Sequence, residues 1–407
     1  MDILRRYSRN LPLLLVIAGV VGSLLMYFTW DIVSASNLYD RHDIGYFFQY
    51  SQWAEGKGVL YKDVYSDYLL LANLLFGVFH FLAATLRPLS TTFKSFSWLW
   101  ASAAWFLYLW VAYLIYTKIS RRAIWIWLSP APIYFAFIRY EIYLVVLTIF
   151  FLFALEREKY FESALWLGAV IALKGYALFA IPPYAVFIFY RKGLATAIKL
   201  TAVCLAPYIL SHLIVFAYAG LEGVGMPYRF QGNRPSTPES LYSVISYILF
   251  LPERLLVPAR LTHFLILATS LIAAALRPKT FEEVVHALML AISGFITFGN
   301  APSPQFLLWI VPMACFSSSR NIRQLTIFLS WLTFFDYPVA QYFVGSRKFG
   351  QLAFSYGAFS FLIGQTLFRI VMVILTAARF VHMYLTYKQV LIEKKHFDNK
   401  ERPIAQQ

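Results

Sequence analysis

Long apolar runs recur through most of this chain of 407 residues. The first covers residues 11–30, and similar runs follow at intervals as far as residue 384. A helix needs about 20 mainly apolar residues to cross a bilayer, and inside lipid only helices or closed barrels satisfy the backbone. Because the runs are continuous rather than alternating, they predict helices. We therefore expect an all-α polytopic membrane protein.

Composition argues against other classes of protein. Hydrophobic residues make up 60% of the chain and charged residues only 14%, which is too little charge for the surface of a soluble domain. The net charge of +15 could indicate nucleic-acid binding. However, the basic residues form short clusters between apolar runs, as cytoplasmic loops do, so we expect no nucleic-acid partner. Cys204 and Cys315 lie in separate apolar segments and do not indicate a compartment.

The basic clusters also predict the topology. Arg5, Arg6 and Arg9 precede the first run, which places the N-terminus in the cytoplasm. No cleavage site follows that run, so we interpret it as a retained first helix. Placing the other clusters on the same side predicts a bundle of about 12 to 13 transmembrane helices. The spans expected after the first are 96–117, 123–138, 141–155, 161–174, 176–190, 195–217, 260–276, 283–299, 305–316, 322–343 and 354–384.

These spans form one transmembrane domain over residues 1–387, followed by a basic cytoplasmic tail over 388–407. Residues 68–86 do not fit the alternation, since a crossing there would place the cluster around Arg121 outside. We therefore expect a re-entrant or interfacial helix, with a plain span as the alternative. Both termini are expected in the cytoplasm, and the membrane is the cell membrane, or the endoplasmic reticulum in a eukaryote.

Residues 40–68, "DRHDIGYFFQYSQWAEGKGVLYKDVYSDY", are far more polar than the apolar runs around them. Asp43, Tyr46, Tyr50 and Trp53 recur at three- and four-residue spacing, so they share one helical face. The glycines of "EGKG" are expected to end that helix. We interpret the stretch as an amphipathic helix at the external interface, holding an acid for work on an amphiphilic substrate. An aromatic belt with solvated charges is the alternative.

Ionisable residues also interrupt the apolar runs at Arg139 and Glu141 in "FIRYEIY" and at Lys174 in "LKGYA". Such groups are costly in a membrane, and they usually pair, face a cavity or mark a substrate path. The alternatives are an ion pair between Arg139 and Glu141 at a helix end, and a Lys174 that reaches the interface. External loops 31–95 and 218–259 would then form the active-site face.

In the second of these loops lie Arg229 and Arg234, whose bidentate guanidinium groups suit a phosphate. "TPES" predicts a helix start with Glu239 in the first turn. In "NAPSPQFLLWIVP", Gln305 lies at a predicted helix N-terminus, where it could hold an anion or a sugar hydroxyl. The histidines lack ligand spacing and no cofactor motif occurs, so none is predicted, although a metal ion is not excluded.

The order of these motifs resembles that of the GT-C superfamily, polytopic glycosyltransferases that use polyprenyl- or dolichyl-phosphate sugars. The mannosyltransferase branches are the most similar. The resemblance covers residues 1–316: an acid, glycine and tyrosine in the first loop, then "DYLLL", "RYE", Lys174, "R…ES" and "SPQFLLW". The last motif is the most specific. The chain departs from the family where Tyr68 is followed by leucines rather than prolines, and where the turn acid is Glu141 rather than aspartate.

The resemblance implies a GT-C-like bundle with external juxtamembrane helices and an inverting transfer of a hexose, mannose being favoured. The acceptor would be a lipid-linked glycan or a glycolipid outside the membrane. Asp43 matches the family's general base, with Asp40 as a rival. Arg229, Arg234 and Lys174 would stabilise the donor phosphate. The sugar or acceptor pocket would be lined by Asp40, Tyr46, Tyr68, Arg139, Glu141, Glu239 and Gln305.

Two other classes remain open. A transporter or flippase for a lipid-linked substrate would carry repeated halves and broken helices near the midplane. A non-catalytic membrane scaffold would explain neither Lys174 nor "RYE".

Overall fold

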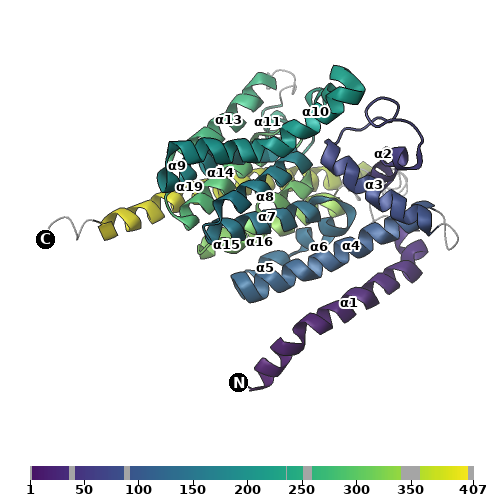
Figure 1. The fold of residues 1–407 in the computed structure, drawn as a ribbon, viewed down its shortest axis with the longest axis horizontal. Helices are drawn as coiled ribbons and strands as arrows, with labels where there is room; N and C mark the ends of the chain where they lie inside the picture. Colours follow the sequence, from purple (N-terminus) through teal and green to yellow (C-terminus); the bar gives the residue numbers. More distant parts are fainter. Residues whose placement is uncertain are drawn as a thin grey trace.

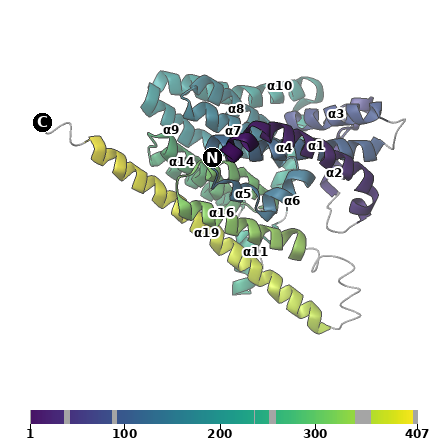
Figure 2. The same ribbon diagram turned by 90° about the horizontal axis from the view of Figure 1, so that it is seen from below.

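The computed structural model describes residues 2–35, 42–86, 92–234, 236–250, 259–340 and 358–401. The chain is 85% helical and its described residues contain no strand, which confirms the all-α class. Most long helices run along a common direction (Figures 1 and 2). The elements are α1 (Asp2–Ala35), α2 (His42–Tyr50), η1 (Gln52–Glu55), α3 (Leu70–Thr85), α4 (Thr92–Leu114), η2 (Ile115–Ile119), α5 (Ile124–Trp127), α6 (Pro130–Ile138), α7 (Glu141–Glu156), α8 (Tyr160–Leu173), η3 (Gly175–Ala180), α9 (Ile181–Lys192), α10 (Leu194–Asn233), α11 (Leu241–Leu249), α13 (Ala259–Ala275), α14 (Phe281–Phe298), η4 (Pro304–Trp309), α15 (Val311–Phe316), α16 (Arg320–Phe334), η5 (Phe335–Ala340) and α19 (Ala358–Glu401).

Four helical segments in the described part of the chain are long and apolar enough to cross a membrane: Thr92–Ile119, Leu194–Asn233, Phe281–Phe298 and Thr366–Phe397. The bent pair α6 and α7 makes a fifth if it counts as one span. The sequence predicts more spans because it does not reveal where helices break. The predicted span 123–138, for example, divides into α5 and α6, and 305–316 divides into η4 and α15.

Close packing against α4 fixes the first helix. Gly19 and Gly22 of α1 lie so near Phe106 and Trp105 that an added Cβ at either glycine would overlap the aromatic ring. The indole N–H of Trp105 donates to the Ala18 carbonyl at 3.0 Å. Small residues let membrane helices approach each other closely, and hydrogen bonds between helices then add to the packing.

Aromatic side chains pack α2 against the bundle and thereby position Asp43, the acid of the first loop. Phe47 of α2 is fully buried and stacks on Phe76 of α3, with ring centroids 4.5 Å apart. It also contacts Trp100 of α4 at 5.1 Å and Tyr140 at 5.9 Å. Because Phe47 is one helical turn from Asp43, this anchoring directs Asp43 toward the start of α7.

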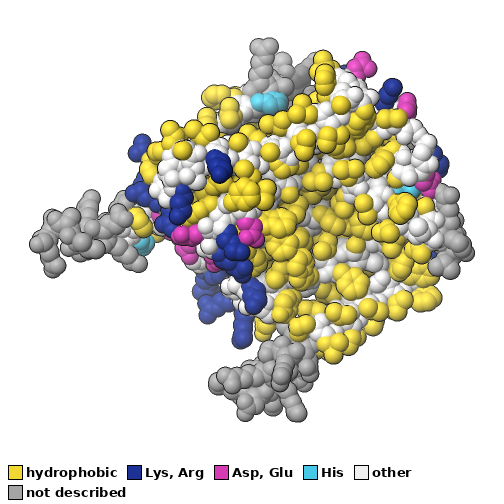
Figure 3. Space-filling model, viewed as in Figure 1, with side chains coloured by type: hydrophobic (Ala, Val, Ile, Leu, Met, Phe, Trp, Pro, Cys, Tyr) yellow, Lys and Arg dark blue, Asp and Glu magenta, His cyan; other side chains and the backbone are white. Residues whose placement is uncertain are grey.

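Charge is distributed unevenly along the bundle. On the face seen in Figure 3, hydrophobic side chains cover the middle, and Lys and Arg side chains gather at the left end, where Figure 1 shows α5, α9 and α15. The start of α1 and the end of α19 point toward the same side, whereas α2 and α3 lie at the right (Figure 1). Several apolar helices of membrane length, together with this charge distribution, are the features of a membrane protein.

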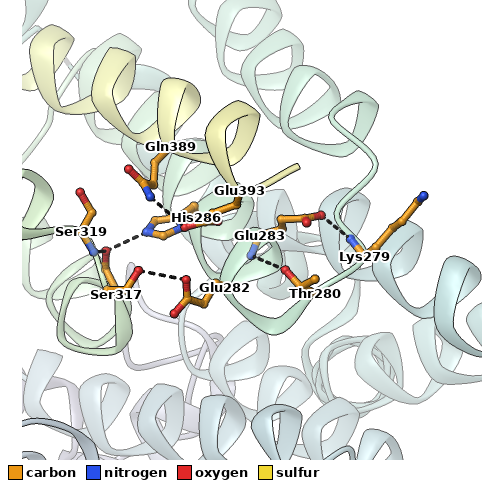
Figure 4. Close-up of polar contacts among 10 residues, drawn as sticks. Lys279, Thr280, Glu282, Glu283, His286, Ser317, Ser319, Gln389 and Glu393 are labelled. Atoms are coloured by element: carbon orange, nitrogen blue, oxygen red, sulfur yellow. Dashed lines mark hydrogen bonds and ion pairs between the residues drawn. The ribbon is translucent and has the colours of Figure 1, made fainter. Parts of the chain in front are cut away.

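Polar contacts join α14 both to α19 and to residues 317–319 (Figure 4). The ring of His286 is buried, with Nε2 2.7 Å from the Ser317 hydroxyl and Nδ1 3.1 Å from Glu393. Gln389 donates to the same Glu393 carboxylate at 3.1 Å. With both ring nitrogens partnered, the burial of this polar side chain is compensated.

Two sequence interpretations need correction. Residues 218–259 are not simply a loop, because α10 continues to Asn233 across a break at Gly220, where φ is 66° and ψ is −168°. Glu239 does not lie in the first turn of a helix: Ser240 is the N-cap of α11, and its hydroxyl accepts the Ser243 N–H at 3.1 Å. The predicted tail over 388–407 continues α19 as a helix as far as Glu401, and Val390 within it is buried.

Candidate active site

The site begins with an ion pair between Asp43 and Arg139. Asp43 lies in the first turn of α2, where the helix dipole favours a carboxylate. Arg139 directly follows α6, at the break where α6 and α7 are bent by 114°. The two side chains are 20% and 10% exposed, respectively. The sequence alternative of a pair between Arg139 and Glu141 is therefore wrong, because each residue pairs with a distant partner.

Glu141 forms the second ion pair, with Lys174. Its Oε1 accepts a hydrogen bond from Lys174 Nζ at 2.6 Å, and its side chain is 1% exposed. Glu141 opens α7 and Lys174 follows α8, so the interruptions noted in the sequence are breaks between helices. Within the described chain Oε2 of Glu141 has no hydrogen-bond partner. One acceptor therefore remains open to a donor such as a hydroxyl group.

Aromatic rings surround the ammonium group of Lys174. Its Nζ lies 4.4 Å from the ring centroid of Tyr140, 5.1 Å from that of Phe306 and 5.0 Å from that of Trp309. Phe306 and Trp309 belong to η4, which starts at Pro304. The "SPQFLLW" motif thus contributes ring faces that stabilise a cation. A buried ammonium with one carboxylate and several rings suits a site for an anionic or hydroxylated ligand.

Tyr68 connects the two ion pairs. Its ring contacts those of Tyr140 at 5.3 Å and Tyr50 at 5.9 Å. The charges of Asp43, Arg139 and Glu141 all act on its phenol electrostatically. Tyr46 is more exposed and stacks on Tyr50 at 5.8 Å. The aromatic face predicted for α2 therefore borders the charged cluster.

Asp67 is a member of this cluster that the sequence analysis did not select. The Tyr50 side chain donates a hydrogen bond to its carboxylate, and the charges of Asp43 and Arg234 act on it. Its Oδ1 is buried and has no hydrogen-bond partner in the part of the chain that the structure describes. Burial raises the pKa of Asp67 above its ordinary value. The sequence signal that could have identified it is its place directly before Tyr68 in the polar stretch 40–68.

The remaining predicted residues are distributed more widely. Arg234 follows α10, and its Nη2 lies 3.3 Å from the hydroxyl of Ser303, next to the "SPQFLLW" helix. Gln305 lies in η4 beside Phe306, whose ring faces Lys174. Arg229 is exposed on α10 and donates to the Glu222 carbonyl at 2.8 Å. These positions connect Arg234 and Gln305 with the charged cluster more directly than Arg229.

Glu239 belongs to a different buried group. Arg379 Nη1 donates to the Glu239 backbone carbonyl at 2.8 Å, and Asp336 interacts electrostatically with both residues. The structure therefore associates Glu239 with η5 and α19 rather than with Asp43. Asp40 lies outside the described residues.

The described residues contain no group of three or more His, Cys, Asp or Glu side chains that could hold a metal ion. What they do bring together is three carboxylates, a lysine, two arginines and several phenols from distant parts of the chain. Carboxylates can accept a proton from a hydroxyl group, and cations can bind an anionic group. No family model, curated protein or solved structure matches this chain.

Proposed function

We propose that this protein is an inverting glycosyltransferase of GT-C type. It moves a hexose, with mannose favoured, from a polyprenyl-phosphate or dolichyl-phosphate donor to a lipid-linked or glycolipid acceptor on the external or lumenal side of the membrane. The observation that carries the proposal is the meeting of the Asp43–Arg139 and Glu141–Lys174 ion pairs around Tyr68. Those residues come from the motifs on which the resemblance rests.

The residues have distinct roles in this proposal. Asp43 removes the proton of the acceptor hydroxyl as its oxygen attacks the anomeric carbon, and Arg139 holds Asp43 in position. Lys174 and Arg234 neutralise charge that develops on the departing phosphate, and Arg229 receives the donor nearer the surface. Glu141, Tyr46, Tyr68 and Gln305 line the pocket for the sugar and acceptor. Enclosure by the aromatic rings strengthens these electrostatic interactions.

The proposal also includes an orientation. The first loop faces outward, and the end rich in Lys and Arg faces the cytoplasm together with both termini. The charge distribution along the bundle supports this orientation.

A transfer assay tests the function. Purified protein in native membrane lipids receives radiolabelled polyprenyl-phosphate mannose or glucose, and labelled lipid product is measured for the wild type and for Asp43→Asn. Loss of a general base lowers the rate by about 10²- to 10⁴-fold, so we expect a decrease in that range. Asp63→Asn is the control, because Asp63 is an exposed acid of the same loop and its replacement is expected to leave transfer unchanged.

Full activity of Asp43→Asn would exclude Asp43 as the base.

A second function, a transporter for a lipid-linked substrate, draws support from the bent pair α6 and α7, whose break carries Arg139. Movement of a labelled lipid across vesicles, without transfer from any prenyl-phosphate sugar, would favour that alternative.

A further inference from the structure

Asp67 differs from Asp43 in its surroundings, although both belong to the cluster around Tyr68. Asp43 is paired with the Arg139 guanidinium. Asp67 is partly buried, its carboxylate receives hydrogen bonds from its own backbone N–H and from the Tyr50 hydroxyl, and one buried oxygen has no partner in the described chain. Two carboxylates in contrasting environments are the usual arrangement of an acid and a base within one site.

Position supports the acidic role for Asp67. The charges of Asp43 and Arg234 both act on it. Arg234 is the arginine that the proposed function assigns to the donor phosphate, so Asp67 is within electrostatic reach of both the base and the phosphate site. The other titratable groups that act on Asp67, or on which it acts, are the phenols of Tyr50, Tyr61, Tyr65, Tyr68 and Tyr140.

The phenols do not compete with Asp67 for this role. Burial raises the pKa of Tyr50, Tyr61 and Tyr65, so these groups remain neutral when Asp67 titrates. Burial likewise raises the pKa of Asp67, against the smaller opposing effects of the hydrogen bond from its own backbone, the Tyr50 hydrogen bond and the Arg234 charge. A carboxyl group in such surroundings holds its proton to a higher pH than an exposed aspartate.

We propose that Asp67 is the general acid of the transfer, donating its proton to the departing phosphate while Asp43 accepts the proton of the acceptor hydroxyl. This inference rests on the proposed function. It adds a second carboxylate to the reaction and assigns each of the two proton transfers to a different carboxylate.

Two protons move in the transfer, one to Asp43 and one from Asp67. The acceptor oxygen forms a bond to the anomeric carbon and its proton passes to Asp43. The bond between that carbon and the bridging phosphate oxygen breaks, and its electron pair stays on the oxygen. That oxygen takes the proton of Asp67 and leaves as prenyl phosphate. The site then holds a protonated Asp43 and an ionised Asp67, and exchange with water returns both to their starting states.

The test is a pH–rate profile of transfer from polyprenyl-phosphate mannose, measured for the wild type, Asp67→Asn and Tyr50→Phe. The reaction needs a protonated Asp67, so the wild-type rate should fall as pH rises through the raised pKa of this group. Asp67→Asn should lower the rate by about 10²- to 10⁴-fold and abolish that fall. Tyr50→Phe removes a hydrogen bond that favours the ionised form, so the fall should move to higher pH.

Asp63→Asn is again the control and should keep the wild-type profile. A purely structural role for Asp67 would lower activity without changing the pH profile, and the Tyr50→Phe variant would then show no displacement. Either that result, or a loss of less than tenfold in Asp67→Asn, would overturn the inference while Asp43→Asn still tests the proposed function. If the wild type transfers no sugar from any prenyl phosphate, the proposed function and this inference fail together.

Discussion

The pair formed by Glu141 and Lys174 allows the free-energy cost of an unpaired buried charge to be measured. Both groups are largely removed from water, and each is the other's main electrostatic partner. Removing one partner of such a pair leaves an uncompensated charge, whereas removing both leaves none. The pair is thus expected to influence stability as well as ligand binding, and the two effects can be separated by mutation.

We expect Lys174→Met to lower the free energy of unfolding by about 3–5 kcal/mol, because the Glu141 carboxylate is left buried alone. The double variant Lys174→Met with Glu141→Gln should recover most of that stability without recovering transfer activity. Thermal or denaturant unfolding in detergent measures the first effect, and the transfer assay measures the second.

An exposed pair provides the matched control. Lys159 and Glu162 form an ion pair of 3.1 Å with side chains 57% and 49% exposed. Lys159→Met should change stability by less than about 1 kcal/mol, since water screens such pairs. If Lys174→Met proved as mild as Lys159→Met, the Glu141–Lys174 pair would not be a desolvated one.

At the scale of helices, the contact between α1 and α4 depends on two glycines. A side chain at Gly22 overlaps Trp105, and the hydrogen bond from this indole to Ala18 restricts how far the ring can move. Gly22→Val should therefore lower stability by about 1–3 kcal/mol through overpacking. The measurement is the midpoint of thermal unfolding in detergent.

Val21→Leu is the control for that experiment, because Val21 is next in sequence and 49% exposed. It adds a carbon on the outer face of α1 and should leave the midpoint within the error of the measurement. Equal effects of the two substitutions would contradict close packing between α1 and α4.

The helices and the site differ in how far the sequence predicts them. Apolar runs and single ionisable residues locate the breaks at Arg139 and Lys174, because a charge inside such a run is costly wherever the helix lies. They do not show that α10 continues past Gly220 to Asn233, since the glycines and the proline there also suit a loop. Whether this segment forms a helix or a loop depends on the packing of α10 against α8 and α9, which the local sequence does not indicate.

Contacts between distant segments are the least predictable part of the site. The arrangement of Lys174 among Tyr140, Phe306 and Trp309 joins three parts of the chain, and no spacing within any of them indicates it. Likewise, no spacing within the sequence indicates the hydrogen bond between Tyr50 and Asp67. Conversely, Glu239 fits a sequence motif, but the structure groups it with Asp336 and Arg379. Ser240 is the N-cap of α11, so Glu239 precedes this helix instead of lying in its first turn.

At the scale of the whole molecule, the orientation depends on whether α3 crosses the membrane. Its 16 residues are fewer than a full crossing requires. In Figure 1 it stays at the end where α2 lies, whereas α4 continues toward the basic end. If only α4 crosses between Lys62 and Arg122, these two residues lie on opposite sides of the membrane. If α3 crosses as well, they lie on the same side.

Cysteine labelling distinguishes the two arrangements. Lys62 and Arg122 are both exposed, and the chain's own Cys204 and Cys315 are buried, so background labelling should be low. We expect a membrane-impermeant maleimide to label Lys62→Cys in intact cells and Arg122→Cys only after permeabilisation. Lys192→Cys, at an exposed position in the last turn of α9, should behave like Arg122→Cys. Labelling of Lys62→Cys and Arg122→Cys from the same side would instead make α3 a full span, and it would move either the first loop or the basic cluster to the other side of the membrane.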